Sequence, residues 1–355
     1  MHLIVSIVMC FFMLLYLVRK FKKIRKLTPY LSKKLWFYMT CFGIATLVSL
    51  FRSYLLGLLV YLILCYLFFD LLGFLVKRIN KAWYEIYLRY YGQGIGIIIV
   101  AIGISVLSMA HVKQIDIINY TIDLDKEFQD NVRIMLVTDL HLGTATNEDT
   151  LALITNTAHK EQPDYLVLGG DIFDESSSDE LMQAAYDSFS KLSQEVPIIY
   201  ILGNHEYIAN LKGEVVLKME QAGVTVLEDE VMLAKEGFYF IGRTDQYHSM
   251  RSNKKRASLA ELLQGLDLTY PVICLDHQPV ELEQARDLGI DIVLSGHTHA
   301  GQFFPATFFA QFFNERLYGL EKDKSLYTVV SSGIGVWGMA MRNASNSEIV
   351  ILDLK

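Results

Sequence analysis

The sequence predicts an N-terminal region of about four membrane-spanning helices followed by a layered α/β domain. The first 110 residues contain long apolar runs and carry 13 basic but only two acidic side chains, although the whole chain has 32 Lys and Arg against 39 Asp and Glu. From residue 111 onward, short apolar runs of strand length alternate with segments of helical pattern, which is typical of α/β domains. We therefore expect two domains, residues 1–110 and residues 111–355.

Four apolar runs predict the membrane spans, because each is near the roughly 20 residues that a helix needs to cross a bilayer. They cover residues 3–18, 35–51, 54–76 and 94–110. A signal peptide is the alternative for the first run, but its basic residues follow the run and no small-residue cleavage site comes after it. The spans contain almost no charge, so we expect them to anchor the protein rather than to transport a solute.

The charges of the loops predict the orientation in the plasma membrane. Segments 19–34 and 77–89 carry nearly all of the basic residues, and short basic loops remain in the cytoplasm. The N-terminus and residues 111–355 are then extracytoplasmic. One miscounted span would reverse this result and make the second domain cytoplasmic.

The second domain is expected to begin with an edge hairpin or a link from the membrane at 115–124. Later strands are predicted at 132–138, 165–168, 197–202, 271–275, 290–294, 327–331 and 348–352, with helices at 147–160, 179–194 and 280–288. Three runs within 224–242 lie too close together for helices between them, so they predict a second layer of mostly antiparallel strands.

Five of the apolar strands end in residues that commonly bind metals. Ligands of open α/β sheets lie outside the carboxyl ends of the strands. An aspartate there can simply cap a helix, and an Asn-His pair can simply form a turn, but five such endings in one chain indicate a shared site. Its residues are Asp139 and His141, Asp171, Asn204 and His205, His277, and His297 and His299.

The number and type of these side chains favour two metal ions. One ion seldom takes seven protein ligands, whereas two ions sharing a carboxylate would, and such a pair can hold a hydroxide nucleophile and clamp a phosphate oxygen. Mixed nitrogen and oxygen ligands suit manganese, iron or zinc better than calcium or magnesium. We expect manganese. No cysteine is in position, which argues against structural zinc.

The ordered motifs resemble those of the calcineurin-like metallophosphoesterases over residues 130–355. They are Asp139-x-His141, Gly170-Asp171-x-x-Asp174, Gly203-Asn204-His205-Glu206, His277 and Gly296-His297-x-His299. The last motif, continued to Gln302, is similar to a bacterial membrane-associated subgroup often compared with UDP-2,3-diacylglucosamine hydrolases. At 343–347 the chain has Asn-Ala-Ser-Asn-Ser where that subgroup would have a Pro-rich turn, which leaves the substrate open.

The resemblance implies an αββα sandwich of two mixed sheets and a role for each motif residue. Asp139, His141 and His299 would bind the first metal, Asp171 would bridge both, and Asn204, His277 and His297 would bind the second. His205 would contact the phosphate and protonate or stabilise the leaving oxygen. Asp174 would orient a ligand or its loop.

Three further features have two interpretations each. The Phe-rich segment 303–313 packs in the core, or it forms an apolar lip that meets the membrane and admits a lipid tail. The basic cluster Arg251, Lys254, Lys255 and Arg256 is a solvated loop, or it meets phospholipid headgroups. Residues 333–335 form a plain turn, or they present backbone N–H groups to phosphate.

Together these features predict a membrane-anchored, dinuclear metal-dependent phosphoesterase, acting as a phosphatase or phosphodiesterase. A metal-bound hydroxide would attack the phosphorus of a mono- or diester, and tethering to the membrane suggests a lipid-linked or cell-envelope substrate. The alternative is a catalytically silent protein of the same fold that binds or senses a phosphate ligand. No protein partner is evident. The acidity of the second domain argues against a nucleic-acid partner.

Overall fold

The computed structural model describes residues 52–91, 94–126, 131–252 and 255–355. By its contacts the chain divides into two compact units, Met1–Ala110 and His111–Lys355. The described part of the first unit is helical, with α3 (Arg52–Ile79), α4 (Lys81–Tyr91) and α5 (Ile95–His111).

Within the described residues, one helix is long and apolar enough to cross a membrane. It covers Leu56–Ile79 in α3 and has a mean hydropathy of 2.4, and α4 and α5 taken together would make a second candidate. The expected spans 3–18 and 35–51 lie outside the described residues. Span 54–76 falls on α3, and span 94–110 falls on α5, which has 17 residues and is short for a span. The prediction of four membrane helices is therefore not supported.

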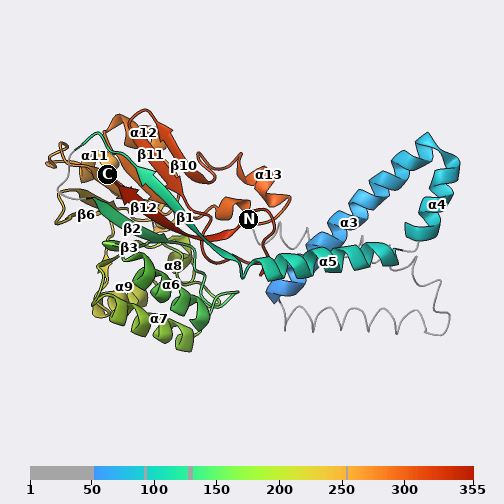
Figure 1. Ribbon diagram of the computed structural model, residues 1–355, viewed down its shortest axis with the longest axis horizontal. Coiled ribbons are helices and arrows are strands. Elements are labelled where there is room, and N and C mark those ends of the chain that lie inside the picture. The colour runs from blue at the N-terminus through green and yellow to red at the C-terminus, as the bar shows by residue number, and fades with distance from the viewer. Residues whose placement is uncertain (1–51, 92–93, 127–130, 253–254) are drawn as a thin grey trace. The chain divides into compact units, whose positions relative to one another are not determined.

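The second unit contains two mixed sheets that pack face to face (Figure 1). The first sheet has the order β1 (Ile115–Ile122), β12 (Ser347–Leu354), β2 (Val132–Val137), β3 (Tyr165–Leu168), β4 (Ile198–Tyr200) and β5 (Thr225–Val226). The second has the order β10 (Gly319–Asp323), β11 (Leu326–Val330), β9 (Ile292–Ser295), β8 (Val272–Leu275), β7 (Tyr239–Gly242) and β6 (Glu230–Leu233).

Helices cover the outer face of each sheet, which gives the four layers of an αββα sandwich (Figure 1). Helices α6 (Glu148–Glu161), α7 (Asp179–Leu192) and α9 (Lys212–Gln221) pack on the first sheet, and α11 (Leu259–Leu262) and α12 (Leu282–Asp287) pack on the second. Between the sheets lies a separate apolar core that includes Ile134, Phe240 and Ile273.

This layering explains why these strands could be predicted from the sequence. Every residue of β3, β8 and β9 is buried, because each strand has a helix layer on one face and the other sheet on the opposite face. Such strands appear as continuous apolar runs rather than as alternating ones. Helix α6 begins where it was predicted, because the side chain of Asn147 accepts a hydrogen bond from the backbone N–H of Asp149.

The structure changes two expectations about the strands. Of the two interpretations of 115–124, the hairpin is excluded, because residues 115–122 form the single strand β1, which pairs in parallel with β12 at the edge of the first sheet. Strand β5 joins the first sheet in parallel with β4, so only β6 and β7 are an antiparallel pair from 224–242. The reason is helix α9, which the sequence analysis missed: a crossover helix between β4 and β5 places them in parallel in one sheet.

One member of the basic cluster, Arg256, forms ion pairs inside the domain. Its side chain is only 7% exposed, and its guanidinium lies 3.0 Å from Asp276 Oδ2 and 3.3 Å from Glu281 Oε2. Arg256 therefore does not meet lipid headgroups. Lys255 is exposed, and Lys254 and the side chain of Arg251 lie outside the described part of the chain.

We expect the Phe240→Ala variant to lower the free energy of unfolding by about 3–5 kcal/mol, because the lost ring leaves a cavity between the two sheets. Chemical denaturation of the full-length protein in detergent, followed by circular dichroism, measures this change. The control is Leu233→Ala on β6, where the side chain is 61% exposed and a change within about 0.5 kcal/mol is expected. Equal losses in the two variants would contradict a tightly packed inter-sheet core.

Candidate metal centre

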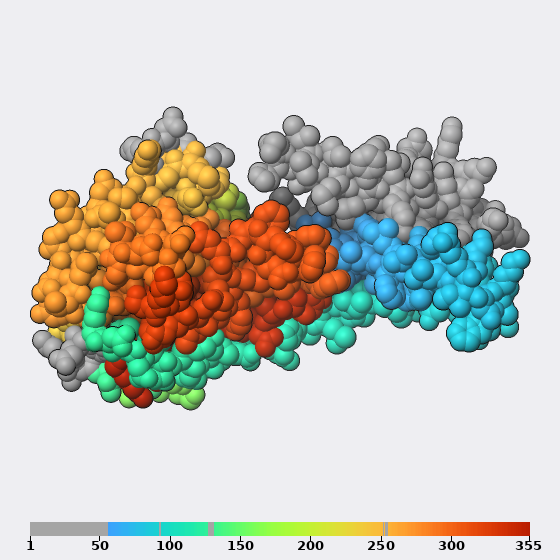
Figure 2. All heavy atoms as spheres, turned by 90° about the horizontal axis from the view of Figure 1, so that it is seen from above, coloured from blue at the N-terminus to red at the C-terminus, as the bar shows by residue number. Residues whose placement is uncertain are grey.

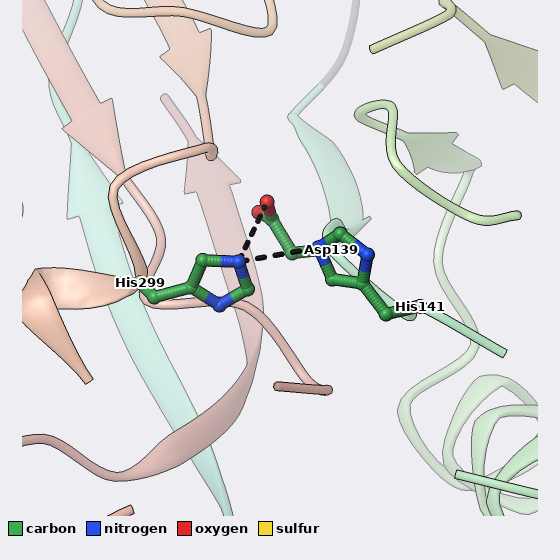
Figure 3. Close-up of side chains that lie close together, drawn as sticks. All are labelled: Asp139, His141 and His299. Carbon is green, nitrogen blue, oxygen red and sulfur yellow. Dashed lines mark hydrogen bonds and ion pairs between the residues drawn. The ribbon is translucent and has the colours of Figure 1, made fainter. Parts of the chain in front are cut away.

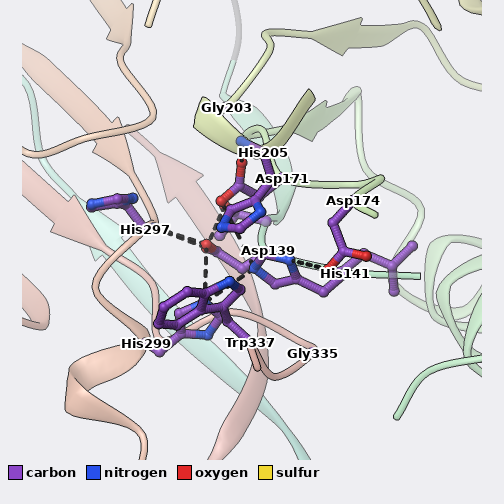
Figure 4. A network of polar contacts seen from close by, with 12 residues as sticks. Asp139, His141, Asp171, Asp174, Gly203, His205, His297, His299, Gly335 and Trp337 are labelled. Atoms are coloured by element: carbon purple, nitrogen blue, oxygen red, sulfur yellow. Dashed lines mark hydrogen bonds and ion pairs between the residues drawn. The ribbon is translucent and has the colours of Figure 1, made fainter. Parts of the chain in front are cut away.

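The loops after β2, β3, β4, β8 and β9 bring side chains together at the carboxyl ends of the strands. Figure 4 labels those from the loops after β2, β3, β4 and β9. Three groups of side chains there each have their ligand atoms within 4.8 Å of one another, and two of the groups share His141. The groups are Asp139, His141 and His299; Asp171, His277 and His297; and His141, Asp174 and His205. The structure thus brings the predicted residues together, with Asn204 beside them between Gly203 and His205 at the start of α8 (Asn204–Ile208).

The first group is buried, and Figure 3 shows its three side chains turned toward one another. The Nε2 atoms of His141 and His299 lie 3.2 Å apart, and Nε2 of His299 lies 3.6 Å from Oδ1 of Asp139. Two imidazole nitrogens and a carboxylate that converge in this way form a donor set typical of a transition-metal site. The backbone N–H of His297 also donates to both oxygens of Asp139 at 3.0 Å, which fixes the carboxylate.

Asp171 belongs to the second group and also approaches the first. Its Oδ2 is 3.1 Å from Nε2 of His277 and 3.8 Å from Nε2 of His141. Nδ1 of His277 contacts the carbonyl oxygen of Gly169 at 2.8 Å, which turns Nε2 of that ring toward the site. The carboxylate of Asp171 is therefore in the position that a bridging ligand needs.

Asn204 gives an independent sign that cations fit this site. Its side chain is buried, and its Oδ1 has no hydrogen-bond partner. A buried amide oxygen without a donor costs free energy, which a bound cation would recover. The residues present therefore fit a two-metal centre.

His205 and Asp174 lie next to the first group. The side chain of Asp174 contacts Nδ1 of His141 at 3.0 Å, so it orients that ring as the sequence analysis expected. The backbone N–H of His205 donates to Oδ1 of Asp171 at 2.7 Å, and its ring centroid lies 4.9 Å from that of His141. Nδ1 of His205 has no hydrogen-bond partner and lies 3.5 Å from the exposed carboxylate of Glu175.

Burial and neighbouring charges shift the pKa values of the site. Burial opposes the charged form of Asp171, but His277 outweighs it, so the pKa of Asp171 lies far below its usual range. Burial and His141 hold the pKa of His299 well below its usual value, and burial and His277 lower the pKa of His297. These shifts favour the ionised carboxylate of Asp171 and the neutral imidazoles of His297 and His299, which are the forms that metals bind. Burial also opposes the charged forms of His141 and His277, but the nearby carboxylates of Asp174 and Asp171 outweigh it and raise the pKa values of these two histidines.

The backbone at the site is strained. Asp139, His141, Asp171, His297 and His299 have φ values of 55°, 44°, 52°, 68° and 49°, in the left-handed region that side chains other than glycine rarely adopt. Strain of this kind is found mainly at functional sites, where the surrounding structure maintains it.

The segment 333–335 is a turn, not a phosphate cradle. The N–H groups of Ile334 and Gly335 donate to the carbonyl oxygens of Thr138 and Asp139 at 3.0 and 2.8 Å, and that of Gly333 donates to Ser331 Oγ at 3.0 Å. A Cβ atom on Gly333 would lie 2.6 Å from Cβ of Asp139, so the turn packs closely against this residue.

Two residues at the site were not given a role by the sequence analysis. The first is Glu206, whose carboxylate is fully buried. It accepts hydrogen bonds from the backbone N–H groups of Asp171, Ile172, Phe173 and Gly203 at 2.7–3.1 Å. Glu206 therefore joins the loop after β3 to the loop after β4. The sequence could have indicated this role only through the position of Glu206 directly after the Gly-Asn-His motif.

The second is Arg342, which is also fully buried. Its Nη2 lies 3.3 Å from Nδ1 of His299 and donates to the carbonyl oxygens of Ser332 and Gly335 at 2.9 and 2.7 Å. Burial lowers the pKa of Arg342 to about 10. No pattern around this residue distinguishes it from a surface arginine.

Comparisons with known proteins agree with this geometry. The family model of the calcineurin-like phosphoesterases matches residues 132–301. A Helicobacter pylori protein named an uncharacterized metallophosphoesterase is 31% identical over 237 residues, which are 66% of this chain and 62% of that protein. A Danio rerio protein named a transmembrane protein with metallophosphoesterase domain is 28% identical over 315 residues, which are 83% of this chain and 71% of that protein.

A solved dimetal phosphatase from Danio rerio has a TM-score of 0.40 at 14% identity, covering 58% of this chain and 88% of that one. The chain spans less than two thirds of the length of the Helicobacter relative and of a Campylobacter jejuni relative, at 62% and 59%.

We expect the Glu206→Gln variant to bind manganese roughly 10–100-fold more weakly, because an amide cannot accept from all four backbone N–H groups and the two loops separate. Isothermal titration calorimetry of the metal-stripped full-length protein measures the affinity. The matched control is Glu214→Gln, an exposed residue of α9. An unchanged affinity in the Glu206 variant would show that the clamp is not needed to position the ligands.

Proposed function

The chain belongs to the calcineurin-like phosphoesterase family, and from this premise we propose that it is a membrane-anchored, two-metal phosphoesterase. The reaction would be the hydrolysis of a phosphate mono- or diester. The observation that carries the proposal is the Asp171 carboxylate, which lies 3.1 Å from His277 of its own group and 3.8 Å from His141 of the first group.

In this proposal Asp139, His141 and His299 hold one metal, and Asn204, His277 and His297 hold the other. Asp171 contributes to both. Manganese is the proposed metal, because the donors are a mixture of imidazole nitrogens and amide and carboxylate oxygens. Once bound, the pair would activate water and stabilise the charge that develops on the phosphoryl oxygens.

His205 is proposed as the group that donates a proton to the leaving oxygen. Its ring lies beside the ligand His141. Nδ1 of His205 lies 3.5 Å from the carboxylate of Glu175, which would hold that side of the ring and leave Nε2 for the substrate.

Anchoring in the membrane is supported by helix α3 and by relatives from Danio rerio and Bos taurus that are named transmembrane proteins. We propose several spans in the plasma membrane, with residues 111–355 on the outer side. The support for this orientation is the basic charge of segments 19–34 and 77–89. A lipid-linked or cell-envelope phosphate ester is the proposed substrate, because a tethered enzyme meets such molecules first.

We expect the full-length protein, stripped of metal and resupplied with manganese, to hydrolyse an aryl phosphate monoester or diester. The Asp171→Asn and His205→Ala variants should lose about 100-fold or more in kcat, because one disturbs both metal positions and the other removes the proton donor. A colorimetric assay of the released aryl alcohol measures turnover, and the preferred ester identifies the substrate class.

The controls are Asp187→Asn and His159→Ala, which replace the same residue types at exposed positions of α7 and α6. A folded protein that binds no metal would exclude the proposal. Binding of two metals without turnover of any ester, whether soluble or in lipid, would favour the silent binding or sensory protein.

A further inference from the structure

Six aromatic side chains form an exposed surface on the second unit, which we call the aromatic surface. Its members are Phe304, Phe308, Phe309, Phe312, Phe313 and Trp337, with exposed fractions of 61%, 56%, 54%, 67%, 84% and 55%. These values contradict the interpretation of the Phe-rich segment as part of the core. Figure 2 shows the segment, in orange, at the surface of the domain.

The clustering is unusual for this domain. Among the described residues of 111–355, every phenylalanine that is exposed belongs to the aromatic surface. Other exposed apolar side chains, such as Ile208, Leu217 and Leu233, lie apart on α8, α9 and β6. Isolated apolar residues are ordinary on a protein surface, whereas a contiguous patch marks an interaction with another protein or with a membrane.

The rings contact one another rather than the core. The ring centroid of Phe308 lies 5.4 Å from that of Phe309 and 5.6 Å from that of Phe312. Helix α13 (Ala306–Ala310), which carries two of these residues, has no buried residue. Phe308, Phe309 and Phe312 therefore form a cluster of rings at the surface rather than a part of the buried core.

The aromatic surface is tied to the metal centre by Gln302. The side chain of Gln302 accepts from the backbone N–H of Trp337 at 3.0 Å and donates to the carbonyl oxygens of Trp337 and Met339 at 3.2 and 3.0 Å. The ring centroid of Trp337 lies 5.7 Å from that of His205 (Figure 4). The surface thus begins beside the proposed proton donor and continues onto α13.

The connection to the first unit indicates what covers this surface. Helix α5 ends at His111 and β1 begins at Ile115, so only residues 112–114 separate an apolar helix from the domain. Three residues span at most about 10 Å. A domain on so short a tether remains beside a bilayer, and exposed aromatic rings partition favourably into the boundary between headgroups and acyl chains.

We infer that the aromatic surface inserts into the outer acyl-chain region of the lipid bilayer and places His205 and the metal centre at the membrane surface. Lipid is therefore the proposed partner of the aromatic surface. A second copy of the chain could cover the same surface, and the experiment below distinguishes contact with lipid from contact between two chains. The inference rests on the proposed membrane anchoring and goes beyond the proposed function, because contact with lipid does not depend on turnover.

Trp337 supplies the probe. The chain has three tryptophans, and Trp36→Phe and Trp83→Phe leave only Trp337. The full-length single-tryptophan protein is placed, one chain per particle, in nanodiscs of phosphatidylcholine that carries bromine at an upper position of the acyl chain. Bromine quenches tryptophan fluorescence at short range. We expect clear quenching relative to unbrominated lipid.

The test variant adds Phe312→Ser and Phe313→Ser, the two most exposed rings, and should roughly halve the quenching because less apolar area remains to enter the lipid. The matched control carries Leu217→Ser and Leu233→Ser instead, and the quenching of its Trp337 fluorescence should be unchanged. Metal affinity of each variant is measured in parallel, so that a folding defect is recognised.

The absence of quenching would overturn the inference, and so would quenching that the Phe312 and Phe313 changes do not alter. Absence of quenching in vesicles, together with cross-linking between chains through this segment, would assign the surface to a second copy. These outcomes are distinguishable from failure of the proposed function, because none of them requires a substrate.

Discussion

The buried carboxylate of Glu206 is the contact on which the geometry of the metal centre depends. It accepts four backbone N–H groups from two loops that follow neighbouring strands, and one of these loops carries Asp171. Burial and the nearby Asp171 raise the pKa of Glu206, while the hydrogen bond from Phe173 opposes that rise. A single acidic side chain thus sets the separation of β3 and β4 at the edge where the ligands gather.

The strained backbone at the ligand positions depends on the same support. Five ligand residues adopt left-handed φ values, which cost on the order of 1–3 kcal/mol each when the residue is not glycine. Hydrogen bonds between loops, such as those from His141 N–H to Asp171 and from His297 N–H to Asp139, hold these conformations. The three buried apolar layers provide the stability that offsets the strain, so the ligands are positioned before any ion arrives.

The sequence was informative where local pattern and structure coincide. Strands buried on both faces appear as apolar runs, and the ligands directly follow them, so the strands around the centre and the gathering of Asp139, Asp171 and His277 could be predicted. Helix α9 was missed because only Val215 and Met219 are buried along it. The sequence did not predict the roles of Glu206, Arg342 and Arg256. These side chains contact residues that are distant in the sequence or backbone groups, and such contacts produce no pattern among neighbouring residues.

The position of β12 in the first sheet has a consequence for synthesis on the ribosome. This strand, the last of the domain in chain order, lies between β1 and β2, the first two. Until residues 347–354 leave the exit tunnel, β1 and β2 have no neighbour on the sides that face each other. A nascent chain halted before that point would therefore display unpaired strand edges to chaperones or proteases.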